Sequence, residues 1–236
     1  MNRNLSPAAR HMARVAAKQA AVIALEEQGS MANATVYEQF LAKLQQDHLR
    51  LKQIQSDQGK AELKRQLLPE YEDYIKGVLE SGAGVQDDVI ATLMVWAIDA
   101  ERYSDLAIPM ATYVLAAGLK LPDRFARTPA TLIAEEIASA ALERLKTGNS
   151  FDVETLISTR VITLEHDMPD QVRAKLELAL GKAILKASDE VEFNVEALKL
   201  AREYLARAIE LHSHCGGKKD LGKVDRLLKK HADTVG

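Results

Sequence analysis

Apolar residues along this chain recur at intervals of three and four positions, which is the spacing of one face of an α-helix. No convincing stretch alternates between apolar and polar residues as a half-buried strand does. Residues 161–164 form the only strand-like run, and they are too isolated to build a sheet. The pattern therefore predicts an all-α fold of successive helices, separated by short breaks that contain glycine or proline.

The first predicted helix opens with Ser6 as its cap and Pro7 at its first position. Its cations Arg10, Arg14 and Lys18 follow at four-residue intervals, so they lie within an arc of about 80° on a helix with 3.6 residues per turn. The apolar side chains are expected on the opposite side: Met12, Val15, Val22 and Ile23. The pattern predicts a helix with one basic face and one apolar face.

A second predicted helix begins at a capping box formed by Thr35 and Glu38 and runs to about Leu68. Its apolar residues follow the spacing of a coiled-coil seam: Tyr37, Phe40, Leu44, Leu51 and Ile54. Such a long and thinly apolar helix needs a partner, either another subunit or a second segment of the same chain. We favour the first interpretation and expect these five residues to join subunits of an oligomeric ring.

The rest of the chain predicts shorter helices. An apolar helix at about 86–102 is expected to be buried, and a short one is expected at about 153–158. The last third predicts helical hairpins with a basic end. We therefore expect four regions: a basic N-terminal helix at 1–30, a long oligomerisation helix at 31–68, a central helical domain at 69–165 and C-terminal helical hairpins at 166–236.

Composition adds a constraint on binding partners. The net charge is −3, so any affinity for nucleic acid must come from a local patch. Both ends are basic: residues 1–20 carry a net charge of +4 and residues 216–236 a net charge of +3, whereas residues 81–167 carry −6. No apolar run is long enough to span a membrane, so no membrane partner is expected.

Four segments in order resemble one known family. They are MARVAAKQ after SPAARH, ATVYEQFLAKLQQDHLRLKQI, LLP followed by GVLESGAGVQDDVIATLMVW, and DMPDQVRAKLELALG. Together they are similar to the small terminase subunit of temperate tailed phages of the peduovirus type. Single segments would be weak, but four in register across most of the chain are specific.

The resemblance implies a role in virus assembly in the host cytoplasm. Family members work with a large ATPase subunit to cut concatemeric DNA at cohesive-end sites and insert it into procapsids. The implied partners are double-stranded phage DNA, the large subunit and further copies of the chain. The family is commonly labelled the endonuclease subunit, so intrinsic metal-dependent cleavage is the alternative, with magnesium as its only implied cofactor. A purely structural adaptor without DNA contact is a third possibility.

The residues themselves suggest where such chemistry would lie. We expect Arg3, Arg10, Arg14 and Lys18 to contact DNA phosphates, although a solvated amphipathic helix also explains them. The second basic patch comprises Lys218, Lys219, Lys223, Arg226, Lys229 and Lys230, and the simpler interpretation of these is a solvated face. No GxxxxGK phosphate loop is present, which argues against ATP hydrolysis.

Candidate catalytic and metal groups are weak in the sequence. Asp87 and Asp88 are neighbours whose side chains diverge by about 100° on a helix with 3.6 residues per turn, so we expect helix capping rather than shared metal binding. His212, His214 and Cys215 match no standard zinc spacing. We expect no metal site, and the catalytic residues, if there are any, stay unassigned.

Overall fold

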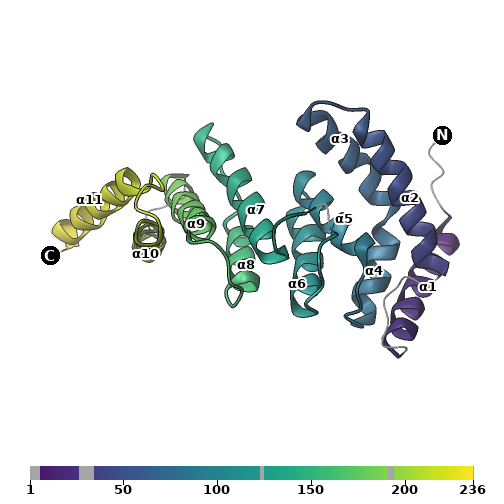
Figure 1. Ribbon diagram of the computed structural model, residues 1–236. Helices are drawn as coiled ribbons and strands as arrows, with labels where there is room; N and C mark the ends of the chain where they lie inside the picture. Colours follow the sequence, from purple (N-terminus) through teal and green to yellow (C-terminus); the bar gives the residue numbers. More distant parts are fainter. Residues whose placement is uncertain (1–5, 27–34, 123–124, 191–193, 236) are drawn as a thin grey trace. The chain divides into compact units, whose positions relative to one another are not determined.

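A computed structural model describes residues 6–26, 35–122, 125–190 and 194–235 (Figure 1). Within these residues every regular element is helical, which confirms the all-α prediction. The chain divides into two compact units, residues 1–129 and residues 130–236. The predicted central region 69–165 spans this division.

The described part of the first unit contains six α-helices. They are α1 (Pro7–Glu26), α2 (Thr35–Lys52), α3 (Asp57–Leu67), α4 (Glu72–Ser81), α5 (Asp88–Asp99) and α6 (Ile108–Ala116). A short 3-10 turn at Leu68–Glu70 joins α3 to α4, and a π-helical turn at Tyr103–Ala107 leads into α6.

Helix α5 forms the centre of the first unit, as its apolar sequence predicted. All residues from Val89 to Ile98 are buried. Helices α2, α3 and α6 contact it. Trp96 meets the edges of two rings, His48 of α2 and Tyr71 between α3 and α4, at centroid distances of 5.2 and 6.2 Å. Burial of this continuous apolar helix contributes to the hydrophobic stabilisation of the unit.

The prediction of one long helix over 35–68 is wrong, because the chain turns between α2 and α3. Helix α2 ends at Lys52, and Ser56 caps α3 by accepting a 3.2 Å hydrogen bond from the Gly59 N–H. The turn lets α3 fold back onto α5, where Lys64 of α3 forms an ion pair with Asp99. The apolar stripe of residues 35–68 therefore packs against other helices of the same chain, which was the second of the two interpretations.

The prediction of which apolar residues α1 buries is also wrong. Met12 is 65% exposed and Ile23 is 53% exposed, whereas the buried positions are alanines, including Ala17 and Ala21. The cause is the close approach of α4. A Cβ atom added at Gly77 of α4 would lie 2.3 Å from the Arg14 carbonyl oxygen, so only small side chains fit between these helices.

Among its described residues, the second unit contains five helices, with α7 beginning at the boundary. They are α7 (Pro129–Lys146), α8 (Val153–Thr163), α9 (Asp170–Glu190), α10 (Val195–Leu211) and α11 (Lys218–Val235). Helix α8 runs past the predicted end near residue 158 and takes in most of the strand-like run. Thr159 and Thr163 fit this helix because their hydroxyls donate to carbonyls one turn earlier, at 2.7 Å each.

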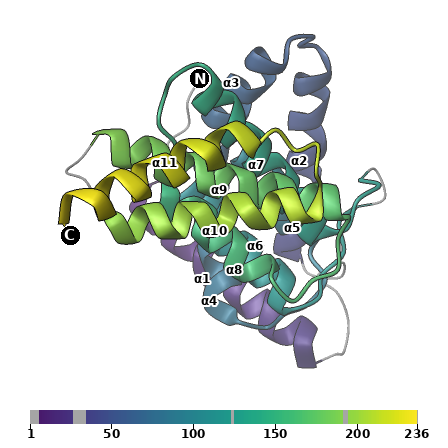
Figure 2. The same ribbon diagram turned by 90° about the vertical axis from the view of Figure 1, so that its left-hand side faces the viewer.

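The predicted C-terminal hairpins are confirmed, since α10 packs along both α9 and α11 (Figures 1 and 2). Gly181 of α9 allows the contact with α10, because a Cβ atom there would lie 2.6 Å from Cγ of Leu205. Val224 places the inner face of α11 in the same apolar cluster. In the described part of the chain, no helix combines the length and apolarity that crossing a bilayer requires.

Candidate nucleic-acid interface

The six cations of the second basic patch share one face of α11. At 3.6 residues per turn they fall within an arc of about 140°. All are exposed except Lys223, which is partly buried. The opposite side of the helix carries Leu221, Val224, Leu227 and Leu228, which pack on the other helices of the unit. The amphipathic pattern therefore directs the exposed cations of α11 away from the core, whereas Lys223 lies at the edge of the cationic face.

Two acidic residues of α11, Asp220 and Asp225, are bound by other helices. Asp220 accepts a 2.6 Å hydrogen bond from Lys182 of α9, and Asp225 accepts one of 2.7 Å from Arg202 of α10. Arg226 donates to the Gly222 carbonyl oxygen at 3.0 Å. The contacts of Asp220 and Asp225 fix α11 to its neighbours and direct these two carboxylates away from its cations.

The predicted basic face of α1 has a different environment. Arg10 lies 3.9 Å from Asp73, and Arg14 lies 3.8 Å from Glu80, both on α4. Lys18 is exposed and has no ion pair within the described residues. Arg3 lies outside the described residues. Helix α4 thus partly neutralises two of the three described cations on this face.

The residues predicted to join subunits lie mostly inside the first unit. Tyr37, Leu44 and Leu51 are buried, and Phe40 and Ile54 are partly buried. Phe40 contacts the ring of Tyr74 at a centroid distance of 4.4 Å. The stripe packs within the chain, so self-association stays a prediction that requires another surface.

The two adjacent carboxylates separate, as predicted. Asp87 is fully buried and caps α5 by accepting a 2.9 Å hydrogen bond from the Ile90 N–H. The Tyr74 hydroxyl donates a second hydrogen bond of 2.6 Å. Burial raises the pKa of Asp87 to about 6, against the opposing effect of these hydrogen bonds. Asp88 is partly exposed and accepts from Gln86 at 2.9 Å instead.

The histidines near residue 212 do not form a metal site with the described residues. The ring centroids of His212 and His214 are 6.0 Å apart, and the Ser213 hydroxyl oxygen lies 3.1 Å from Nδ1 of His214. No group of three His, Cys, Asp or Glu side chains that could hold a metal ion occurs in the residues that the structure describes.

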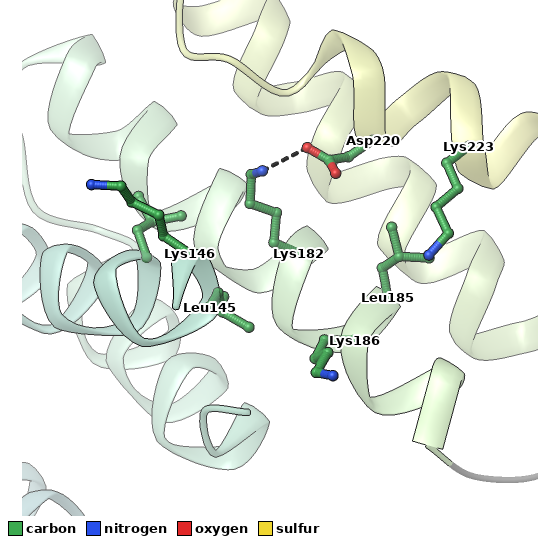
Figure 3. A pocket seen from close by; sticks show the side chains of 8 residues that line it. Leu145, Lys146, Lys182, Leu185, Lys186, Asp220 and Lys223 are labelled. Carbon is green, nitrogen blue, oxygen red and sulfur yellow. Dashed lines mark hydrogen bonds and ion pairs between the residues drawn. The ribbon is translucent and has the colours of Figure 1, made fainter. Parts of the chain in front are cut away.

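Sequence reasoning missed a lysine-lined cavity in the second unit. Its volume is about 420 Å³, and Lys146, Lys182, Lys186 and Lys223 contribute to its wall (Figure 3). They come from α7, α9 and α11. In the sequence, only the four-residue spacing of Lys182 and Lys186 indicated that two of these lysines share a helix face. Periodicity does not show which helices pack together, so it could not bring Lys146 and Lys223 to the same cavity.

Comparison with known proteins gives two matches. The family described as phage small terminase subunit matches residues 41–171. The chain is also similar to the protein named "Terminase, endonuclease subunit" of Escherichia phage P2. The two are 40% identical over 224 residues, which covers 95% of this chain and 86% of the phage P2 protein. No solved structure gives a significant match.

Proposed function

Because this chain belongs to the family of phage small terminase subunits, we propose that it binds the cohesive-end site of concatemeric phage DNA and recruits the large ATPase subunit. In this role it regulates the cutting of DNA and its entry into procapsids, in the host cytoplasm. Several copies act together, so that weak phosphate contacts on each copy add up along one duplex.

The cationic face of α11 is the observation that carries the DNA-binding part of the proposal. Lys and Arg side chains bind the phosphate backbone with little dependence on sequence and release its condensed counterions. A helix that carries six cations on one side, with Asp220 and Asp225 bound to other helices, has the charge distribution that this interaction needs. Such contacts position a protein on the duplex, whereas base contacts give specificity.

Helix α1 supports a second contact. The ion pairs of Arg10 and Arg14 are long and partly exposed, and exposed pairs contribute only about 0–1 kcal/mol each. DNA phosphates can therefore compete with Asp73 and Glu80 for these guanidinium groups. The predicted DNA contacts of Arg3, Arg10, Arg14 and Lys18 stay part of the proposal, with α1 ranked below α11.

A charge-reversal experiment tests the proposal. The variant Lys219→Glu with Arg226→Glu changes two exposed cations of the α11 face, whereas Lys199→Glu with Arg207→Glu makes the same change on exposed positions of α10. Fluorescence anisotropy with cohesive-end DNA should show binding weakened roughly tenfold or more by the first variant and much less by the second. Equal effects of the two variants, or no binding by the unchanged protein, would contradict the proposal. Absence of DNA binding by the unchanged protein would favour an adaptor without DNA contact.

The name of the phage P2 relative favours one alternative, an intrinsic endonuclease. The described carboxylates do not fit the magnesium site that such an enzyme implies. Asp87 is buried as a helix cap, and Asp88 bonds to Gln86, so the two do not face one ion. Two-metal nucleases need carboxylates grouped around ions ~3.5–4 Å apart.

Cleavage by the purified chain decides this alternative. Cohesive-end DNA is incubated with magnesium or manganese, with and without the large subunit. We expect cutting only when the large subunit is present. Cutting by the chain alone, lost in Asp88→Asn and retained in the exposed control Asp57→Asn, would establish the endonuclease instead.

A further inference from the structure

The lysine-lined cavity of the second unit has both a charge and an apolar floor. Its wall contains the four lysines and one carboxylate, Asp220, which accepts a hydrogen bond from Lys182 (Figure 3). Leu142, Leu145 and Leu185 line the rest. The volume of about 420 Å³ greatly exceeds the ~30 Å³ that one water molecule occupies in the liquid. A ligand that complements this lining carries carboxylates around one or two apolar side chains.

Phosphate groups alone do not match this cavity well. The phosphates of a DNA backbone could contact the lysines, but the backbone offers little apolar surface to cover the leucines. Interfaces between proteins, in contrast, combine an apolar centre with a polar rim. The lining therefore favours a protein segment over a nucleic acid.

A segment with the required chemistry lies on the same unit, where α8 ends. Val161 and Leu164 are three residues apart, hence on one helix face, and are 62% and 47% exposed. Glu165, Asp167 and Asp170 follow. All three are exposed, and none has an ion pair within the described residues. Arg173 donates to the Leu164 and His166 carbonyls of this segment, whereas the nearby Arg160 and Arg207 pair with Glu177 and Glu210. The three carboxylates therefore leave an acidic excess beside two uncovered apolar side chains, which complements the lysines and leucines of the cavity.

The two surfaces cannot meet within one chain. Asp170 is the first residue of α9, whereas Lys182 and Lys186 lie 12 and 16 positions later on the same helix. At 1.5 Å per residue the separation along the axis is roughly 18–24 Å. A contact between these surfaces therefore joins different copies of the chain.

We propose that the lysine-lined cavity binds residues 161–170 of a second copy, so that the second units associate head to tail. Because the two contacting surfaces differ, the contact is heterologous, and repetition closes a ring or extends an open chain. This contact goes beyond DNA binding: it assigns self-association to residues outside the predicted stripe of α2. Its charged rim also makes the association sensitive to salt.

Charge reversal on each surface tests the contact in the full chain. The cavity variant is Lys146→Glu with Lys186→Glu, and the segment variant is Glu165→Lys with Asp167→Lys. Controls with matched charge changes are Lys199→Glu and Glu203→Lys on α10, at exposed positions outside both surfaces. Native mass spectrometry and sedimentation should show an oligomer for the unchanged chain and the controls. Each variant should associate roughly tenfold or more weakly, since like charges then oppose each other.

Mixing the two variants separates a heterologous contact from other kinds. The segment variant keeps an intact cavity, and the cavity variant keeps an intact segment, so a mixture restores the original contact. The reversed cavity of one variant also faces the reversed segment of the other, so the mixture should regain an assembly larger than that of either variant alone. A chain with all four substitutions exchanges the charges of the two surfaces and should regain the larger assembly. This recovery also shows that the single-surface variants were folded.

Several outcomes would overturn the contact. A monomeric unchanged chain at high concentration would contradict the proposed contact directly. Variants that form assemblies of the same mass as the unchanged chain would contradict it as well. Loss of DNA binding by the cavity variant without any change in assembly would show that the cavity belongs to the DNA interface. Failure of the α11 variant to weaken DNA binding, in contrast, affects only the proposed function.

Discussion

The Tyr74 hydroxyl donates a 2.6 Å hydrogen bond to the buried carboxylate of Asp87, and this pair joins α4 to the first turn of α5. The carboxylate also caps α5 through the Ile90 N–H. A single buried acid thus fixes two helices of the first unit. Its charge is costly, because burial removes water from the ionised form.

This burial predicts a pH-dependent stability. The carboxyl of Asp87 has a pKa of 3.8 when unperturbed and about 6 in the folded chain, so the folded state binds the proton more tightly between these values. Its contribution to the unfolding free energy is therefore greatest below about pH 4 and decreases as the pH rises to about 6. A shift of about two units corresponds to at most about 3 kcal/mol.

The variant Asp87→Asn isolates this contribution, since an amide caps the helix but does not ionise. Urea unfolding between pH 4 and pH 7 should show Asp87→Asn gaining stability relative to the unchanged chain as the pH rises. Asp152→Asn, at the exposed cap of α8, controls for replacement of a cap. If the difference in unfolding free energy between Asp87→Asn and the unchanged chain stays constant from pH 4 to pH 7, the raised pKa of Asp87 is contradicted.

Asp47 predicts the opposite dependence. Burial alone would raise its pKa, but hydrogen bonds from Lys43, Tyr71 and Arg50 outweigh burial and hold the pKa below 3.8. Its stabilising effect is present above pH 3.8 and is lost as the pH falls through the lowered pKa. Asp47→Asn should cost about 1–3 kcal/mol at pH 7. The cost should shrink near pH 3, while the exposed Asp57→Asn changes little at either pH.

Two glycines give a matched test of helix packing. Gly77→Ala places a Cβ atom 2.3 Å from the Arg14 carbonyl oxygen, so α1 must move away from α4. We expect a loss of roughly 1–3 kcal/mol in urea unfolding, as for other overpacked contacts. Gly222→Ala on α11 meets nothing within 4 Å and should gain about 0.5–1 kcal/mol through helix propensity. Equal stability of the two variants would show that α1 is not held at Gly77.

Helix content was predictable because each helix carries its own signals. Ser6 and Asp87 mark starts that the structure confirms. The face that each helix buries was less predictable. On α1 the larger residues Met12 and Ile23 would supply more buried area, but the approach of Gly77 excludes them. Local hydrophobicity does not contain this constraint, which depends on a residue more than fifty positions away.

The partner of an apolar stripe was not predictable from periodicity. The spacing of Tyr37, Leu44 and Leu51 fits a seam between subunits and fits equally a seam within the chain. Ser56 and Gly59, which allow the chain to turn, were the available signal for the second interpretation. The lysine-lined cavity shows the same limit, since α7, α9 and α11 become neighbours only in the folded unit.

The two basic faces predict different salt dependences of DNA binding. Each phosphate contact contributes about 0.9 to the slope of log K against log salt concentration. Lys229 is exposed on α11 and has no ion pair within the described residues, so Lys229→Gln should lower the slope by about that amount. Arg14 already lies 3.8 Å from Glu80 and releases fewer counterions when it binds, so Arg14→Gln should lower the slope less. Anisotropy titrations between low and moderate salt measure both slopes, with Lys199→Gln on α10 as the control. A larger change for Arg14→Gln than for Lys229→Gln would make α1 the principal DNA contact, because the slope reports the number of phosphates that the protein neutralises.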